Sequence, residues 1–177
     1  MTVTDIPEGF ERHTRKSPLT DPWEPLYSKQ TDKAVIIGLR LAKPHTNGRG
    51  LIHGGLIAAL ADNAMGHSCA HVMGGVSSLV TISLAVDFIG TAEVGQWLTV
   101  ESDVVKTGKT ICFVQSLIKA NDVVVARANA TFRVVPKREM MSFRDGAPAP
   151  DPESRDSGFD ASHRPGMTRI IIPQLAT

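Results

Sequence analysis

Apolar and polar residues alternate along several stretches of this chain, with the period of two that is typical of β-strands. The first such stretch covers residues 33–43 and is followed by Pro44, which favours its end. A second covers residues 78–89, and we expect its larger side chains to face the core and its smaller ones to face away. The larger set is Val80, Ile82, Leu84, Val86 and Phe88, and the smaller set is Thr81, Ser83, Ala85 and Asp87.

The rest of the alternating pattern predicts an antiparallel meander. Three further apolar segments follow one another closely along the chain, over residues 97–106, 109–120 and 123–135. They are separated by Thr107-Gly108 and Asn121-Asp122, and such dipeptides favour tight turns between neighbouring antiparallel strands. The strands therefore form a sheet with one broad face that another element must cover.

A glycine-rich turn, residues 47–55, leads into an alanine-rich segment, residues 56–70. At 100° per residue this segment is apolar on nearly all sides, which indicates a largely buried helix. Its small residues share one face, along which another backbone or a substrate can approach closely. They are Gly55, Ala58, Ala59, Asp62, Gly66 and Cys69. The pattern predicts an α+β fold in which an antiparallel sheet wraps around one long central helix.

Both ends of the chain differ from its middle. Residues 1–30 contain four prolines, so we expect an arm with one short helix over Gly9–Arg15 and no other regular structure. Residues 31–136 form the predicted domain. Residues 137–177 are rich in Pro, Asp, Ser, Gly and Arg and are predicted to be an irregular tail.

Composition narrows the classes of partner and compartment. With 177 residues, 42% of them hydrophobic, the chain can form one core of ordinary size. Its formal net charge of +1 gives no electrostatic reason to expect nucleic acid or an anionic membrane as a partner. Its first residues lack a signal-peptide pattern, no apolar stretch approaches the roughly 18 residues that span a bilayer, and both cysteines lie in apolar runs. We therefore expect a cytoplasmic protein with reduced thiols.

Asp62 is the main candidate for chemistry. It is the only acid between Asp32 and Asp87 and lies in mid-helix, too late to cap the N-terminus. The backbone N–H of Gly54, at the helix start, has no intrahelical partner and can polarise a carbonyl. Eight residues at roughly 1.5 Å each place the two groups about 12 Å apart, so a second subunit must supply one of them. The structural alternative is a satisfied aspartate at the edge of a helix pair.

Two other residue patterns suggest competing sites. His67 and His71 are four residues apart on one helix face and could bind a metal together. No acid accompanies them, so we predict no metal site and no cofactor. Cys69 has no histidine base fixed beside it by any motif, so it is predicted to be a buried, inert thiol.

The turn and the helix together carry a motif. Asn47, His53-Gly54-Gly55 and Leu60-Ala61-Asp62 stand at a spacing that resembles the hotdog-fold thioesterases, specifically the phenylacetate-pathway (PaaI-like) group. The resemblance covers about residues 31–136. It implies a hotdog fold, hydrolysis of acyl- or aryl-coenzyme A thioesters to free acid and coenzyme A, and homodimers that often pair into homotetramers.

The resemblance also assigns roles to single residues. It makes Asp62 the catalytic carboxylate, as nucleophile or general base, and the Gly54 N–H the donor to the oxyanion. Asn47 and His53 would orient the nucleophile or the carbonyl, and Thr81 would help to hold water. Gly55 and Ser83 are further residues expected to contact the substrate. Apart from the resemblance, Arg49 in the glycine turn and Lys106 and Lys109 beside Thr107-Gly108 are candidates to bind the phosphates of coenzyme A, and the alternative for each is an ordinary solvated charge.

Two other functions are compatible with the same residues. A non-catalytic hotdog protein would bind acyl-coenzyme A without cleaving it, although such a regulator needs a fused effector domain and the sequence shows none. An enoyl-coenzyme A hydratase on the same fold would need a histidine paired with an acid, a role open to His53 and Asp62.

Overall fold

The computed structural model describes residues 6–74 and 78–135, and the predicted tail, residues 137–177, lies outside these ranges. Seven strands form one antiparallel sheet in the order β1-β2-β3-β5-β6-β7-β4. The strands are β1 (Glu11–Arg12), β2 (Leu26–Gln30), β3 (Val35–Arg40), β4 (Ser78–Phe88), β5 (Trp97–Thr107), β6 (Ile111–Ala120) and β7 (Val123–Val135). The helices are α1 (Gly54–Val72) and two 3-10 turns, η1 (Asp21–Trp23) and η2 (Lys43–His45).

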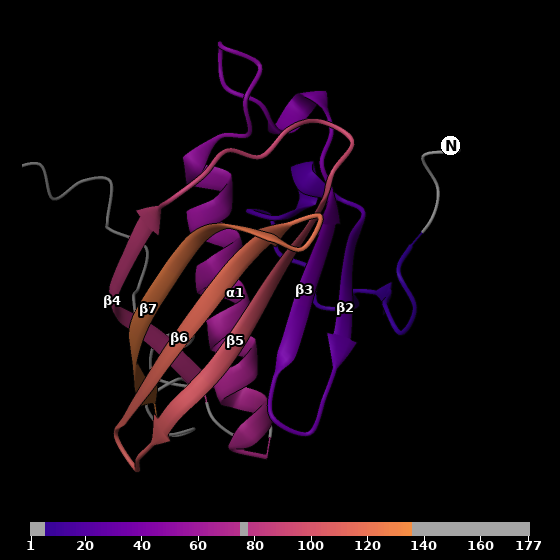
Figure 1. The fold of residues 1–177 in the computed structure, drawn as a ribbon. Coiled ribbons are helices and arrows are strands. Elements are labelled where there is room, and N and C mark those ends of the chain that lie inside the picture. Colours follow the sequence, from indigo (N-terminus) through magenta and orange to yellow (C-terminus); the bar gives the residue numbers. More distant parts are fainter. Residues whose placement is uncertain (1–5, 75–77, 136–177) are drawn as a thin grey trace, which may run out of the picture.

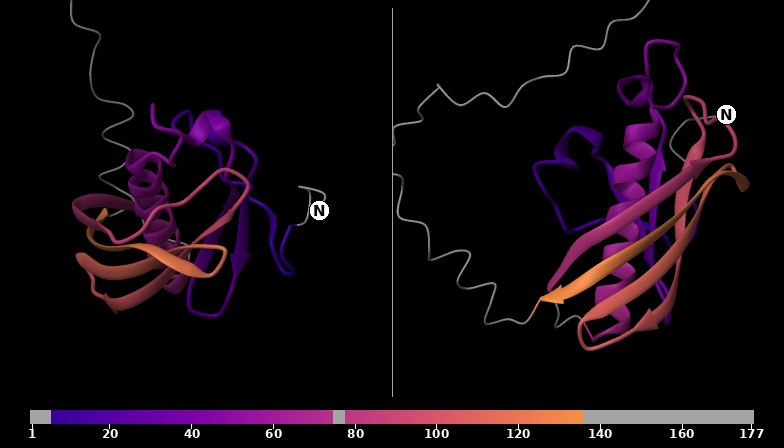
Figure 2. Two further views of the ribbon diagram at one scale, coloured as in Figure 1. Left: turned by 45° about the horizontal axis from the view of Figure 1, so that its top comes forward. Right: turned by 90° about the vertical axis from the view of Figure 1, so that its left-hand side faces the viewer.

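The sheet curls around α1, so that helix and sheet share one core (Figures 1 and 2). The predicted α+β arrangement of an antiparallel sheet around one long helix is confirmed. Side chains on every second position of β5, β6 and β7 face α1 and are buried against it. The largest buried contributors include Leu60, Met65, Leu98, Val100, Ile118 and Phe132.

Helix α1 begins and ends where local chemistry requires. The His53 ring caps its N-terminus by accepting a hydrogen bond from the Gly55 N–H, and Gly74, with a φ of +75°, follows its last turn. Most of its length is buried, and Asp62, Asn63, Gly66 and His67 form a partly open stripe. Among the described residues, neither α1 nor any other helix is long and apolar enough to cross a bilayer.

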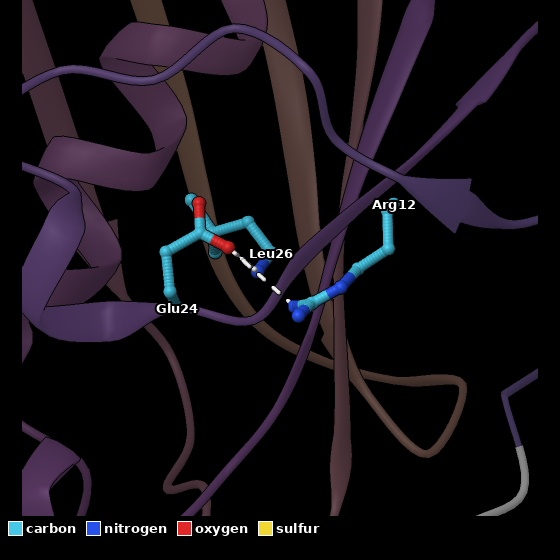
Figure 3. Close-up of polar contacts among 3 residues, drawn as sticks. All are labelled: Arg12, Glu24 and Leu26. Atoms are coloured by element: carbon cyan, nitrogen blue, oxygen red, sulfur yellow. Dashed lines mark hydrogen bonds and ion pairs between the residues drawn. The ribbon is translucent and has the colours of Figure 1, made fainter.

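The helix predicted over Gly9–Arg15 is wrong. Gly9 has a φ of +82°, which belongs to a turn, and residues 11–12 then form β1. β1 pairs with β2, and β2 pairs along its whole length with β3, so the arm adds two strands to the sheet. The carboxylate of Glu24 joins these strands by accepting the Leu26 N–H at 3.2 Å and pairing with Arg12 at 3.5 Å (Figure 3).

The prediction that the larger side chains of β4 share one core-facing side is also wrong. A β-bulge between Thr81 and Ser83 shifts the register against β7. Thr81 therefore lies opposite the buried Phe132, on the helix side, whereas Val80 lies opposite Arg133, on the outer side. β4 is the last strand of the sheet, and Val80, Ile82 and Phe88 are 56%, 58% and 55% exposed.

Candidate active site

The carboxylate of Asp62 projects from the third turn of α1 toward β4. Its Oδ1 accepts a hydrogen bond from the Thr81 hydroxyl at 2.9 Å. The bulge after Thr81 is what turns this side chain to the helix side of the sheet. Because Oδ1 is occupied and no hydrogen bond to Oδ2 is recorded from any described residue, Oδ2 is left for a water molecule or a substrate carbonyl.

The N-terminus of α1 presents a second polar group. Nδ1 of His53 accepts the Gly55 N–H at 2.8 Å, so the ring holds the turn rather than pairing with an acid. Within residues 6–74 and 78–135, the Gly54 N–H has no recorded hydrogen-bond acceptor. Phe88 of β4 lies against this position, since a Cβ on Gly54 would come within 3.0 Å of the phenyl Cζ. Because glycine has no Cβ, the Phe88 ring can pack against this helix end without a clash, and the Gly54 N–H stays without an acceptor among the described residues.

Asn47 shapes the loop that precedes the helix. Its Oδ1 accepts the backbone N–H groups of Arg49 at 2.9 Å and Leu51 at 3.3 Å, which is the geometry of an Asx turn. Asn47, Gly54 and Phe88 line one small cavity of about 160 Å³. The side-chain carbonyl of Asn47 is therefore used by its own loop, and its amide group remains for a ligand in this cavity.

The two polar groups do not meet within one chain. Asp62 and Thr81 line a cavity of about 270 Å³, and this cavity is separate from the one lined by Gly54. Eight helical residues separate Gly54 from Asp62, which corresponds to about 12 Å along the axis. The arrangement supplies a carboxylate and an oxyanion donor in two half-sites that face the same strand, β4.

A sequence model of the thioesterase superfamily matches residues 49–127, which contain Gly54, Asp62 and Thr81. A protein of Pseudomonas aeruginosa named “Putative esterase” is 34% identical over 133 residues, which are 75% of this chain and 99% of that protein. The chain belongs to the thioesterase superfamily. It is therefore a thioester hydrolase, and this membership confirms the enzyme class that the motif predicted.

Other relatives of this thioesterase agree with the assignment. The human protein named acyl-coenzyme A thioesterase 13 is 30% identical over 79 residues, 45% of this chain and 56% of its own. Two solved structures share the fold, at 23% identity or less. A conserved Pseudomonas aeruginosa protein has a TM-score of 0.62 over 68% of this chain and 95% of its own, at 23% identity. A Streptococcus pneumoniae protein described as a hypothetical thioesterase and solved with coenzyme A has a TM-score of 0.59 over 64% of this chain and 90% of its own, at 20% identity. The hotdog fold is confirmed.

The remaining predicted contact residues of this thioesterase are spread over the molecule. Ser83 lies opposite Thr131 on the outer side of the sheet, away from Asp62. Lys106 and Lys109 lie at the β5–β6 turn, beside the C-terminal end of α1, whereas Arg49 lies in the loop before its N-terminal end (Figures 1 and 2). One chain therefore does not bring these cations together.

Three competing site readings are disfavoured by the contacts. His71 donates or accepts through both ring nitrogens, to Gln30 and to the Thr31 carbonyl, and no group of three metal-ligating residues occurs in the described ranges. Burial, and then contact with Cys112, raise the pKa of the Cys69 thiol, which suits a structural role. Within one chain His53 and Asp62 do not form the pair that hydration would need, because His53 Nδ1 accepts the Gly55 N–H and Asp62 accepts from Thr81.

The sequence analysis missed one wall of the Asp62 cavity. Arg15, from the arm, lines this cavity together with Asn63 and His67 of α1. The guanidinium of Arg15 lies 3.2 Å from Nδ1 of His67, and burial lowers the pKa of His67 to about 4, with smaller contributions from His13 and Arg15. The only available signal was that His67 and Asn63 share the helix face beside Asp62.

Proposed function

We propose that this thioesterase hydrolyses acyl-coenzyme A, with Asp62 of one subunit and the Gly54 N–H of another acting on the same thioester. The hydrogen bond between Thr81 and Asp62 carries the proposal. It fixes a carboxylate in a cavity between α1 and β4, the edge strand of the sheet. The coenzyme is suggested by relatives: one is named an acyl-coenzyme A thioesterase, and a solved neighbour contains coenzyme A.

In this mechanism the thioester carbonyl oxygen accepts the Gly54 N–H, which stabilises the negative charge that develops there. Asp62 then either removes a proton from an attacking water or attacks the carbonyl carbon itself. In the first route water forms the new carbon–oxygen bond directly; in the second, attack by Asp62 gives an anhydride, which a water molecule then hydrolyses to regenerate the carboxylate. Both routes break the carbon–sulfur bond, leave a free acid and release coenzyme A as its thiol, with water as the source of the proton. Thr81 donates to Oδ1 and so directs the other carboxylate oxygen at the reaction.

A homodimer through β4 would join the two half-sites. β4 ends the sheet and exposes Val80, Ile82 and Phe88, so its free edge and its apolar side chains are both available to a second copy. A two-fold axis beside this strand would bring Gly54 of one chain toward Asp62 of the other. Pairing of dimers, membership of the PaaI-like group, a cytoplasmic location and phosphate contacts by Arg49, Lys106 and Lys109 remain predictions.

The experiment compares the acid of the proposed site with an acid outside it. Asp62→Asn keeps the shape of the side chain but cannot act as a base or nucleophile, so turnover of acyl-coenzyme A should fall on the order of 10²-fold or more. Asp87→Asn is the control, because Asp87 lies on the outer face of β4 and pairs with Arg127. Parent activity in a folded Asp62→Asn protein would refute the proposed role.

Mixing two inactive variants then tests the shared site. Asp62→Ala retains the Gly54 donor, and Gly54→Pro removes that donor at the first helical position, where the helix needs no N–H but the ring of Phe88 must move aside. Random mixed dimers should recover up to about one quarter of the parent activity per chain, since half the dimers carry one intact site in two. Circular dichroism must first show that both variants fold. No recovery from verified mixed dimers would contradict a site built from two chains.

A further inference from the structure

The Asp62 cavity continues as a groove along α1, away from the helix start. The partly open residues Asn63 and Gly66 of α1 line it, together with the buried Ala70. Thr81, Leu79 and the ring of Phe132 bound the groove on the sheet side, and Arg15 of the arm lines it as well. At about 270 Å³ the cavity is near the lower limit of small-molecule sites, which suits a short acyl chain.

Arg15 brings a positive charge to this groove. A guanidinium stays charged at any physiological pH, and among residues 6–74 and 78–135 the three recorded ion pairs do not include Arg15. Its recorded polar contact is His67 Nδ1, at 3.2 Å. Arg12, only three residues earlier in the same arm, differs in this respect because it pairs with Glu24.

His67 accepts a hydrogen bond from Arg15 and lines the same cavity. Burial lowers the pKa of His67 to about 4, so the ring is neutral near pH 7. A guanidinium can only donate, so Nδ1 of His67 must accept from Arg15, and the ring proton then lies on Nε2. The guanidinium of Arg15 therefore keeps its positive charge and the donors that His67 does not use, in the cavity that Asp62 also lines, and it calls for an anionic group on the part of the ligand beside it.

We propose that Arg15 is a specificity residue that selects short acyl groups carrying a carboxylate at the end remote from the thioester. The inference rests on the proposed function, because the same groove must hold the acyl chain while the thioester lies at Asp62. Asp62 and Arg15 line one cavity, so a chain of a few carbons can place its thioester at the first and its carboxylate at the second. Gly66 has no side chain and Ala70 only a methyl group, which leaves room in this cavity for the methylene groups of the chain.

A phosphate of coenzyme A is the other anion that Arg15 could bind, and two matched substrates separate these sources. Glutaryl- and valeryl-coenzyme A have five-carbon acyl chains and differ in one terminal carboxylate. The measured quantity is the ratio of kcat/KM for glutaryl- to valeryl-coenzyme A, after subtraction of the spontaneous rates. Arg15→Gln is compared with Arg12→Gln, which removes an arginine from the same arm but outside the groove.

The parent enzyme should prefer glutaryl-coenzyme A, and Arg15→Gln should lower the ratio about tenfold or more, the size expected for loss of a charge-assisted hydrogen bond. Arg12→Gln should leave the ratio unchanged, and Arg15→Lys should restore part of it. An equal loss on both substrates would show that Arg15 binds the coenzyme and would overturn the inference. So would an unchanged ratio in Arg15→Gln. Absence of turnover with every acyl-coenzyme A would instead refute the proposed function.

Discussion

Replacement of His67 by glutamine tests the contact between the arm and α1. The quantity compared is the free energy of unfolding of the parent and the variant as a function of pH. Burial, with His13 and Arg15 close by, lowers the pKa of His67 from 6.5 to about 4. Between these two values the unfolded chain binds a proton that the folded chain does not. The stability from this group is therefore fully present above about pH 6.5 and is lost as the pH falls toward 4.

The size of the effect follows from the pKa difference. One pKa unit corresponds to about 1.4 kcal/mol, so a pKa near 4 in place of 6.5 gives an upper limit on the order of 3 kcal/mol. The ring is partly exposed, which reduces the expectation to about 2 kcal/mol. Glutamine keeps an acceptor for Arg15 but does not titrate. The stability advantage of the parent over His67→Gln should thus shrink by about 2 kcal/mol between pH 7.5 and pH 4.5.

Urea unfolding followed by circular dichroism measures this difference, at one fixed protein concentration because association also stabilises the fold. His13 titrates in both proteins, so its contribution largely cancels. Thr14→Ala is the control, since it alters the same arm without removing a titratable group. If the parent and His67→Gln differ by the same free energy at both pH values, the buried neutral state assigned to His67 is incorrect.

Substitutions at two further positions test the Asp62 half-site and the exposed strand. Thr81→Val removes the hydroxyl that donates to Asp62 and should lower kcat, measured as release of the coenzyme A thiol, about tenfold. Thr81→Ser keeps a hydroxyl and should retain most of the activity, and equal rates in these two variants would exclude an orienting role. Ile82→Lys places a cation on the exposed edge strand and should shift sedimentation toward monomer with parallel loss of activity, while an unchanged oligomer would place the interface elsewhere.

The central part of the fold was predictable because its signals are local. Alternation with period two located the meander, and the turn dipeptides Thr107-Gly108 and Asn121-Asp122 located its hairpins; the latter pair has positive φ values of 46° and 66°. The continuously apolar segment located α1. Each of these patterns depends on neighbours within a few residues, so tertiary contacts did not need to be known.

The arm was mispredicted because its structure depends on distant residues. β2 exists through pairing with β3, and β1 exists through pairing with β2. Phe10 stacks edge-on against Trp97 at 5.3 Å between ring centroids, a contact that spans most of the domain sequence. A two-residue strand has no periodicity to detect, and the prolines of this region argue only against a long helix. The position of Arg15 in the lining of the Asp62 cavity could not be predicted for the same reason.

The bulge in β4 shows a different limit. The alternation from Val80 to Phe88 has no interruption in the sequence, so nothing local indicates that the strand changes phase. The shift appears only in the register against β7, between its partners Phe132 and Thr131. The resemblance nevertheless selected Thr81, and the structure gives that choice a physical basis, because the bulge turns this hydroxyl to Asp62.

The unusual features of the single chain have one common explanation. The Gly54 N–H lacks a recorded acceptor among the described residues, Asp62 lies about 12 Å farther along the helix, and β4 exposes apolar side chains at an open sheet edge. Phe88 lies against Gly54, and Thr81 of the same strand contacts Asp62. A second copy placed antiparallel along β4 would cover the apolar edge and would bring each Gly54 toward the other chain's Asp62. We infer that a single contact between subunits both buries β4 and completes the active site. A substitution that prevents this contact should therefore abolish catalysis while the core of each chain stays folded.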